Sequence, residues 1–201
     1  MELRKLTKFE IKNIKLIILF ICIIGFIAIF EEVCKQEIIK LDIMGYNLVS
    51  KFLISDFATP IAKVITNFGG VIFIAISTII LFVGIKNKKI GAAIVINLFT
   101  ITFLNLLLKN IVQRPRPTEF RLIDENGYSF PSGHSMVSMA FYGFLIYIVY
   151  KYIKIRNLKV ALIIVLSILP ILIGISRIYL GVHYTIIYTR IFKKIVVEEK
   201  T

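Results

Sequence analysis

Three cationic residues and two histidines are spaced along this chain in a way that suits chemistry on a phosphate group. Lys109 and Arg116 are separated by six residues, and Arg177 is separated from His183 by five. His134 lies between these segments and, with His183, makes up the whole histidine content. Arginine offers planar paired donors to phosphate oxygens, and lysine offers a compact positive charge. If these segments meet in the folded protein, their side chains form a site for a phosphate group.

The residues just before His134 suit the start of a helix that approaches an anion. Pro131 and Ser132 are favoured at helix N-termini, and Gly133 lets the backbone come close to a ligand. Free N–H groups and the helix dipole attract phosphate to such a terminus. The alternative interpretation is that Ser132 only caps the helix.

The two histidines suggest a division of labour between a nucleophile and a general acid. A metal site is not expected, because two histidines lack a third ligand at a recognisable spacing. The sequence therefore predicts neither a metal nor another cofactor.

The elements that must position these residues are membrane helices. Of the 201 residues, 58% are hydrophobic and the mean hydropathy is +0.86. The apolar residues form blocks that approach the roughly 20 residues needed to cross a bilayer. A single membrane domain over residues 1–201 is expected. The net charge of +13 lies at the ends of the apolar blocks, which favours contact with anionic lipid over binding of nucleic acid.

The pattern predicts an all-α, polytopic transmembrane bundle with five spans. These spans cover Leu16–Phe30, Val64–Ile85, Ile90–Leu108, Ser135–Tyr150 and Val160–Ile175. Residues 31–63 mix charged and apolar side chains, which favours an interfacial helical segment over a crossing. The polar Asn97 and Asn105 of the third span are expected to face other helices.

Basic clusters predict how the spans are oriented in the cell membrane. The clusters at residues 1–15, 86–89 and 151–159 are expected to be cytoplasmic, and two spans separate each from the next. The N-terminus is then cytoplasmic. The same topology puts the segments that carry Lys109, His134, Arg177 and His183 on the outer face. The site is therefore expected to face outward.

Taken together, these motifs resemble the type 2 phosphatidic acid phosphatase family, which is related to the vanadium haloperoxidases. The three parts of the pattern run from Lys109 to Arg116-Pro117, from Pro131 to His134, and from Ser176-Arg177 to His183. The resemblance implies a metal-independent hydrolase of a phosphomonoester or pyrophosphate on a membrane lipid. Undecaprenyl pyrophosphate, phosphatidylglycerophosphate and phosphatidate are the candidate substrates, and the sequence does not rank them.

The resemblance also implies a role for each residue. His183 attacks phosphorus to give a phosphohistidine, and His134 protonates the leaving oxygen. The groups that hold the phosphoryl oxygens are Lys109, Arg116, Ser132, the Gly133 amide and Arg177. Electrostatic clamping of this kind is what phosphoryl transfer mainly requires.

The chain departs from the family pattern after His183. The family has an aspartate four residues further on, where this chain has Ile187, although Asp124 or Glu125 could fold nearby. The family also continues into a sixth span, whereas residues 185–201 are short and charged. We expect this tail to reflect a shifted reading frame or a short variant. The alternative function is then an impaired family member that only binds lipid phosphate. A transporter or channel subunit is the third and least favoured hypothesis.

Overall fold

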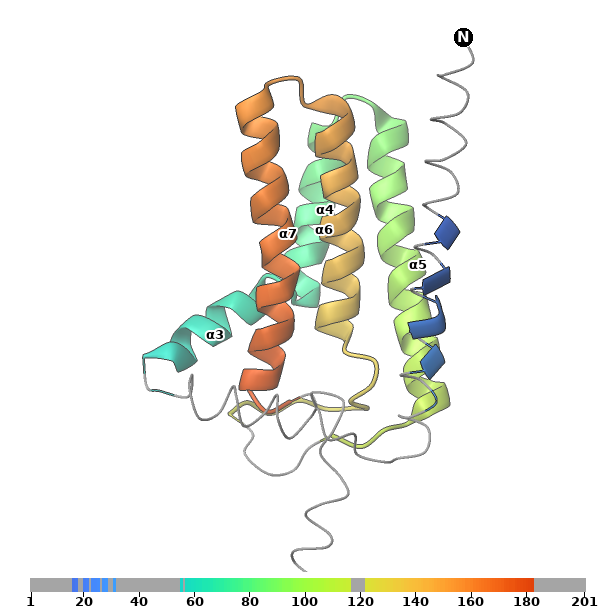
Figure 1. Ribbon diagram of the computed structural model, residues 1–201, viewed down its shortest axis with the longest axis vertical. Helices are drawn as coiled ribbons and strands as arrows, with labels where there is room; N and C mark the ends of the chain where they lie inside the picture. Colours follow the sequence, from blue (N-terminus) through green and yellow to red (C-terminus); the bar gives the residue numbers. More distant parts are fainter. Residues whose placement is uncertain are drawn as a thin grey trace, which may run out of the picture.

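The computed structural model describes residues 57–116 and 122–182, together with Ser55 and scattered positions between 16 and 31. All regular elements with assigned bounds in these residues are helices. They are α3 (Ala58–Asn67), α4 (Val71–Gly84), α5 (Lys88–Val112), α6 (Gly133–Tyr152) and α7 (Arg156–Tyr179) (Figure 1). The prediction of an all-α fold is confirmed. The interfacial segment up to residue 54, most of the N-terminal block and the tail at 185–201 lie outside the described residues.

The helices α4 to α7 run roughly parallel to one another, and α3 slants away from them (Figure 1). Three of them, α5, α6 and α7, are long and apolar enough to cross a membrane, and the bent pair of α3 and α4 would make a fourth. Large apolar side chains such as Ile80, Phe99 and Val165 are exposed. Contact with lipid explains this exposure, because hydrocarbon solvates apolar side chains and every backbone polar group is bonded within the helix.

The interior of the bundle combines an apolar cluster with a few polar links between helices. The cluster is formed by Ile74, Ile94, Phe141, Tyr142 and Ile173. The Asn97 side-chain amide donates to the Ala140 carbonyl of α6 at 3.1 Å, and that of Asn105 donates to the Met136 sulfur of α6 at 3.5 Å. The expectation that both asparagines face other helices is therefore confirmed.

The predicted span Val64–Ile85 is not one continuous helix, because the chain leaves the helical conformation in its middle. The α3 helix begins at Ala58 and ends at Asn67, α4 starts at Val71, and the two are bent by 45°. Glycines at positions 69 and 70 lower the cost of a non-helical backbone, and Gly70 is extended with φ −70° and ψ 149°. The Tyr142 hydroxyl donates to the Phe68 carbonyl at 2.8 Å, which satisfies an acceptor at the break.

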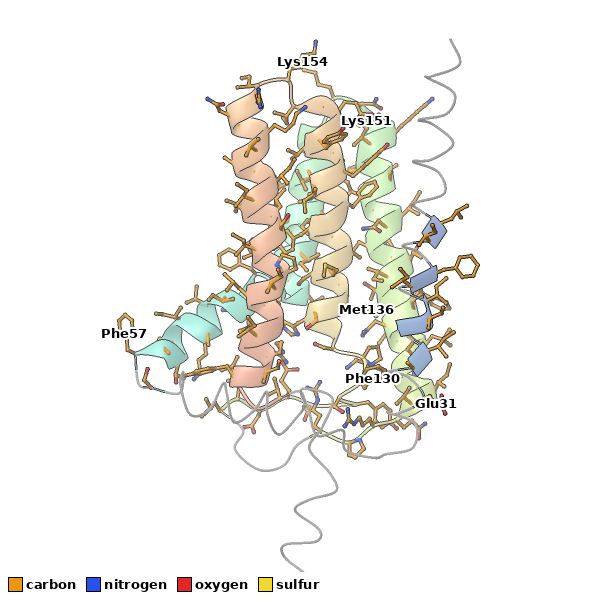
Figure 2. The ribbon with its side chains drawn as sticks, in the orientation of Figure 1. Glu31, Phe57, Phe130, Met136, Lys151 and Lys154 are labelled. Atoms are coloured by element: carbon orange, nitrogen blue, oxygen red, sulfur yellow. The ribbon has the colours of Figure 1, made fainter. Side chains whose placement is uncertain are left out.

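The two ends of the bundle differ in character. The short connections at residues 85–87 and 153–155 lie at one end, where Lys151 and Lys154 are labelled (Figure 2). The long loop between α5 and α6 lies at the other end, near Phe130. The α5 helix stops there because Gln113 is left-handed (φ 49°) and Pro115 follows two residues later.

We expect Tyr142→Phe to destabilise the bundle, because it leaves the partly buried Phe68 carbonyl without this donor. The free energy of unfolding should fall by about 1–3 kcal/mol. Thermal unfolding in detergent micelles measures the effect. Tyr150→Phe is the matched control, because Tyr150 is 68% exposed and should change stability by less than about 0.5 kcal/mol. Equal stability of the two variants would contradict this account of the break.

Candidate active site

Three helix ends bring the predicted site residues together. Lys109 lies in the last turn of α5, His134 in the first turn of α6 and Arg177 in the last turn of α7. All three lie at the end of the bundle that carries the long loop (Figure 1). The expected meeting of the motif segments is thus observed for these three residues. His183 lies outside the described residues, although Val182 just before it is fully buried.

Arg177 is the most deeply buried cation among the described residues, with 1% of its surface exposed. Its Nη1 donates to the Thr66 hydroxyl at 3.1 Å, and its Nη2 lies 2.7 Å from a carboxylate oxygen of Glu125. Its Nε has no hydrogen-bond partner in the described part of the chain. A buried guanidinium that still has an N–H group without a partner among the described residues is suited to binding an anion, because the anion can accept a hydrogen bond from that group.

Arg116 ties the loop to the segment that precedes His183. Its Nε donates to the Gly127 carbonyl at 2.9 Å and its Nη2 to the Asn126 carbonyl at 3.2 Å. Its Nη1 donates to the Val182 carbonyl at 2.9 Å. The guanidinium therefore holds the backbone next to the predicted nucleophile. The sequence suggested only a role in phosphate binding for this arginine, and the structure adds an organising role.

Lys109 also contributes to the order of the loop. Its ammonium group donates to the Tyr128 carbonyl at 2.7 Å. The Ser129 amide in turn donates to the Arg114 carbonyl at 2.8 Å, so that the two sides of the loop are joined. The ammonium group of Lys109 is thereby tied to the loop.

The start of α6 has the geometry expected of a capped helix. The Ser132 hydroxyl accepts from the Ser135 amide at 3.3 Å, so Ser132 is the N-cap and any contact with phosphate stays a prediction. A Cβ atom at Gly133 would lie 3.3 Å from the Asn105 side-chain oxygen. Glycine is favoured at this position because α5 and α6 approach each other so closely.

A cavity of about 320 Å³ opens beside these groups. Its polar lining includes Lys109, Arg116, Glu125 and His134. The rest of the wall is mainly apolar and comes from α4, α5 and α6. A ligand in this cavity would meet positive charge at one end and hydrocarbon along the remainder. Among the described residues, no three His, Cys, Asp or Glu side chains cluster closely enough to hold a metal ion, and independence from metal stays a prediction.

Glu125 occupies the centre of the cation cluster, which the sequence did not indicate. Its carboxylate lies 2.7 Å from Arg177 and 3.5 Å from Arg116. Burial alone would raise the pKa of Glu125, but the hydrogen bond and charge of Arg177, with the charge of Arg116, hold that pKa below its ordinary value of 4.5. The sequence had suggested Glu125 only as a possible partner of His183. The position of Glu125 in the loop between two predicted phosphate motifs is the signal that could have found it.

Comparison with known proteins relates this arrangement to a family. Residues 89–186 match the PAP2 superfamily. Over 82 residues the chain is 39% identical to phosphatidylglycerophosphatase B of Bacillus subtilis (strain 168). That match covers 40% of this chain and 40% of the length of the relative.

Two solved structures share the fold. The crystal structure of the first transmembrane PAP2 type phosphatidylglycerolphosphate phosphatase from Bacillus subtilis matches with a TM-score of 0.68 and 26% identity, over 81% of this chain and 85% of that chain. Aquifex aeolicus LpxE matches with a TM-score of 0.61 and 21% identity, over 74% of this chain and 86% of that chain. The second likeness is evidence for the fold alone.

We expect Glu125→Gln to make stability less dependent on pH. A carboxylate with a lowered pKa contributes stability above its unfolded-state pKa and loses it as the pH falls through the folded-state pKa. The wild type should therefore be more stable than the variant at neutral pH, by about 1–3 kcal/mol. The two should converge in acid. Thermal unfolding across pH measures this.

The matched control is Asp124→Asn, because Asp124 is exposed and adjacent. It should leave the free energy of unfolding at neutral pH within about 0.5 kcal/mol of the wild-type value. The same Glu125→Gln protein should bind inorganic phosphate roughly tenfold more tightly at neutral pH, since an anion no longer competes for the two arginines. Weaker binding than in wild type would contradict the placement of Glu125 at the anion site.

Proposed function

Because the chain carries a PAP2 superfamily domain, we propose that it is a lipid phosphatase that removes a terminal phosphate from a membrane lipid. Phosphatidylglycerophosphate is the leading substrate, since both Bacillus subtilis proteins described above are named for it. Undecaprenyl pyrophosphate and phosphatidate are the other candidates. The alternative is an impaired member that only binds lipid phosphate, and Ile187 at the position of the family aspartate favours it.

The cavity is the observation that carries this proposal. Lys109, Arg116 and His134 line its charged part, which suits a phosphate group. Val71, Leu98, Leu106 and Val137 are among the residues of its apolar walls, which suit the first carbons of an acyl or prenyl chain. A water-soluble phosphate ester would leave these walls unused.

The chemistry follows the roles that the motifs imply. In the first step, an imidazole nitrogen of His183 bonds to phosphorus as the bond from phosphorus to the lipid oxygen breaks, and His134 gives that oxygen a proton. In the second step, water attacks phosphorus, loses its proton to His134 and releases inorganic phosphate with His183 restored. The bond between Arg116 and the Val182 carbonyl supports this assignment, since it holds the chain beside the proposed nucleophile.

The phosphoryl oxygens are held by electrostatic contacts in both steps. The proposed set comprises Lys109, Arg116, Arg177, Ser132 and the Gly133 amide. Phosphate competes with Glu125 for Arg177, because a second anion close to the carboxylate that lies 2.7 Å from this guanidinium is repelled by it. Developing charge on the transferred group would then be stabilised by donors that are already in place.

The orientation of the site is part of the proposal. The basic turns at 86–89 and 151–159 lie at the end of the bundle opposite to the long loop (Figure 2). If positive turns stay in the cytoplasm, the cation cluster faces outward in the cell membrane. The substrate would then be dephosphorylated in the outer leaflet.

We expect the purified protein to release phosphate from phosphatidylglycerophosphate in detergent micelles with a chelator present. His183→Ala should lower the rate by roughly 10³-fold or more, as expected for loss of a nucleophile. Phosphate release assayed with each of the three candidate lipids measures both substrate and rate.

Tyr150→Ala is the control for this assay, because Tyr150 is exposed and distant from the cation cluster along α6. If wild type and His183→Ala released phosphate at the same background rate, the alternative of a protein that only binds lipid phosphate would be favoured. Loss of activity on adding the chelator would instead contradict a metal-independent reaction.

A further inference from the structure

The break between α3 and α4 contacts the site, although none of the motifs includes it. Thr66 lies in the last turn of α3 and is 5% exposed. Its hydroxyl accepts from Arg177 Nη1 at 3.1 Å, across 111 residues of sequence. This bond and the ion pair with Glu125 are the two contacts that hold the buried guanidinium among the described residues.

The backbone of the break also packs against the start of α6. A Cβ atom at Gly69 would lie 2.7 Å from both the Ile173 side chain and the Ser138 hydroxyl, and 3.5 Å from the His134 ring. Gly69 further lines the cavity beside His134. The lack of a side chain at Gly69 is therefore what allows the break to reach the site.

The two contacts of Arg177 differ in what happens when phosphate binds. Glu125 is an anion, so phosphate competes with it for the guanidinium. Thr66 is a neutral acceptor, and its bond is compatible with a phosphate on the other donors of Arg177. Once the carboxylate has left, Thr66 is the remaining contact among the described residues that keeps the long arginine side chain in place.

We propose that Thr66 is a positioning residue for Arg177 and that the broken span exists to bring it there. A straight helix would not combine this hydroxyl with the close approach of Gly69 to α6. The inference rests on the proposed role of the cation cluster in binding phosphate. The competing explanation is that Thr66 only satisfies a buried donor, in which case it affects stability but not the affinity for anions.

Binding of inorganic phosphate to the full-length protein in detergent tests the proposal without requiring turnover. Thr66→Val keeps the shape but removes the acceptor, and should weaken phosphate binding about 10-fold to 100-fold, as loss of a hydrogen bond to a charged group does. Thr66→Ser keeps the hydroxyl and should stay within about threefold of wild type. Calorimetry measures the affinities, and thermal unfolding shows that each variant is folded.

A double-mutant cycle separates positioning from packing. In the Arg177→Lys background, Thr66→Val should weaken phosphate binding by less than about twofold, because its effect acts through the guanidinium. If Thr66→Val lowered the affinity for phosphate as much in the Arg177→Lys background as in the protein that keeps Arg177, the proposal would be overturned. A wild-type affinity for phosphate in the Thr66→Val single variant would also overturn it.

Two glycine variants keep the test decisive if Thr66→Val does not fold. Gly69→Ala should move the break away from α6 and α7 and weaken phosphate binding at least about tenfold. Gly143→Ala is the matched control, since a Cβ atom there meets nothing within 4 Å, and it should bind like wild type. Equal affinity of the two would overturn the proposal.

These outcomes are distinct from failure of the proposed function. If the affinity for inorganic phosphate depends on Thr66 but no candidate lipid is hydrolysed, the proposed phosphatase activity is contradicted and the positioning role is supported. If Thr66→Val hydrolyses a lipid phosphate at the wild-type rate, the phosphatase activity is supported and the positioning role is contradicted.

Discussion

The structure depends on the burial of one positive charge, the guanidinium of Arg177. A buried charge costs several kcal/mol unless it is paired and hydrogen-bonded. The partners come from separate parts of the chain, with Thr66 at the end of α3 and Glu125 in the loop between α5 and α6. Three segments must therefore converge for this charge to be tolerated. The same convergence is the basis of the proposed anion site.

Arg116 extends this constraint to the rest of the loop. Its donors are bonded to the carbonyls of Gly127, Asn126 and Val182, so one side chain joins the loop to the end of α7. Arg116 thus fixes the loop and the segment before His183 relative to each other. Glu125 lowers the repulsion between the two arginines, because its carboxylate lies 2.7 Å from Arg177 and 3.5 Å from Arg116.

Sequence patterns were enough for the family and for the helices nearest the site. Apolar blocks predicted α5, α6 and α7 to within a few residues, because lipid requires long uninterrupted apolar segments. The order of the motifs predicted the PAP2 superfamily, and the comparison confirms it. The break within Val64–Ile85 was not predicted, because a glycine pair is compatible with either a straight or a broken helix. The bond from Tyr142 to Phe68 stabilises the broken form.

By itself, the sequence determined that Lys109, His134 and Arg177 would lie at one end of a membrane bundle, since the spacing of the spans decides which helix ends share a face. Only the tertiary structure decided what surrounds them. Glu125 lies among the cations, and Thr66 holds Arg177 from 111 residues away. The physical reason is that these contacts depend on where a loop folds back and where a helix bends. Both are set by packing between distant segments and not by any local pattern.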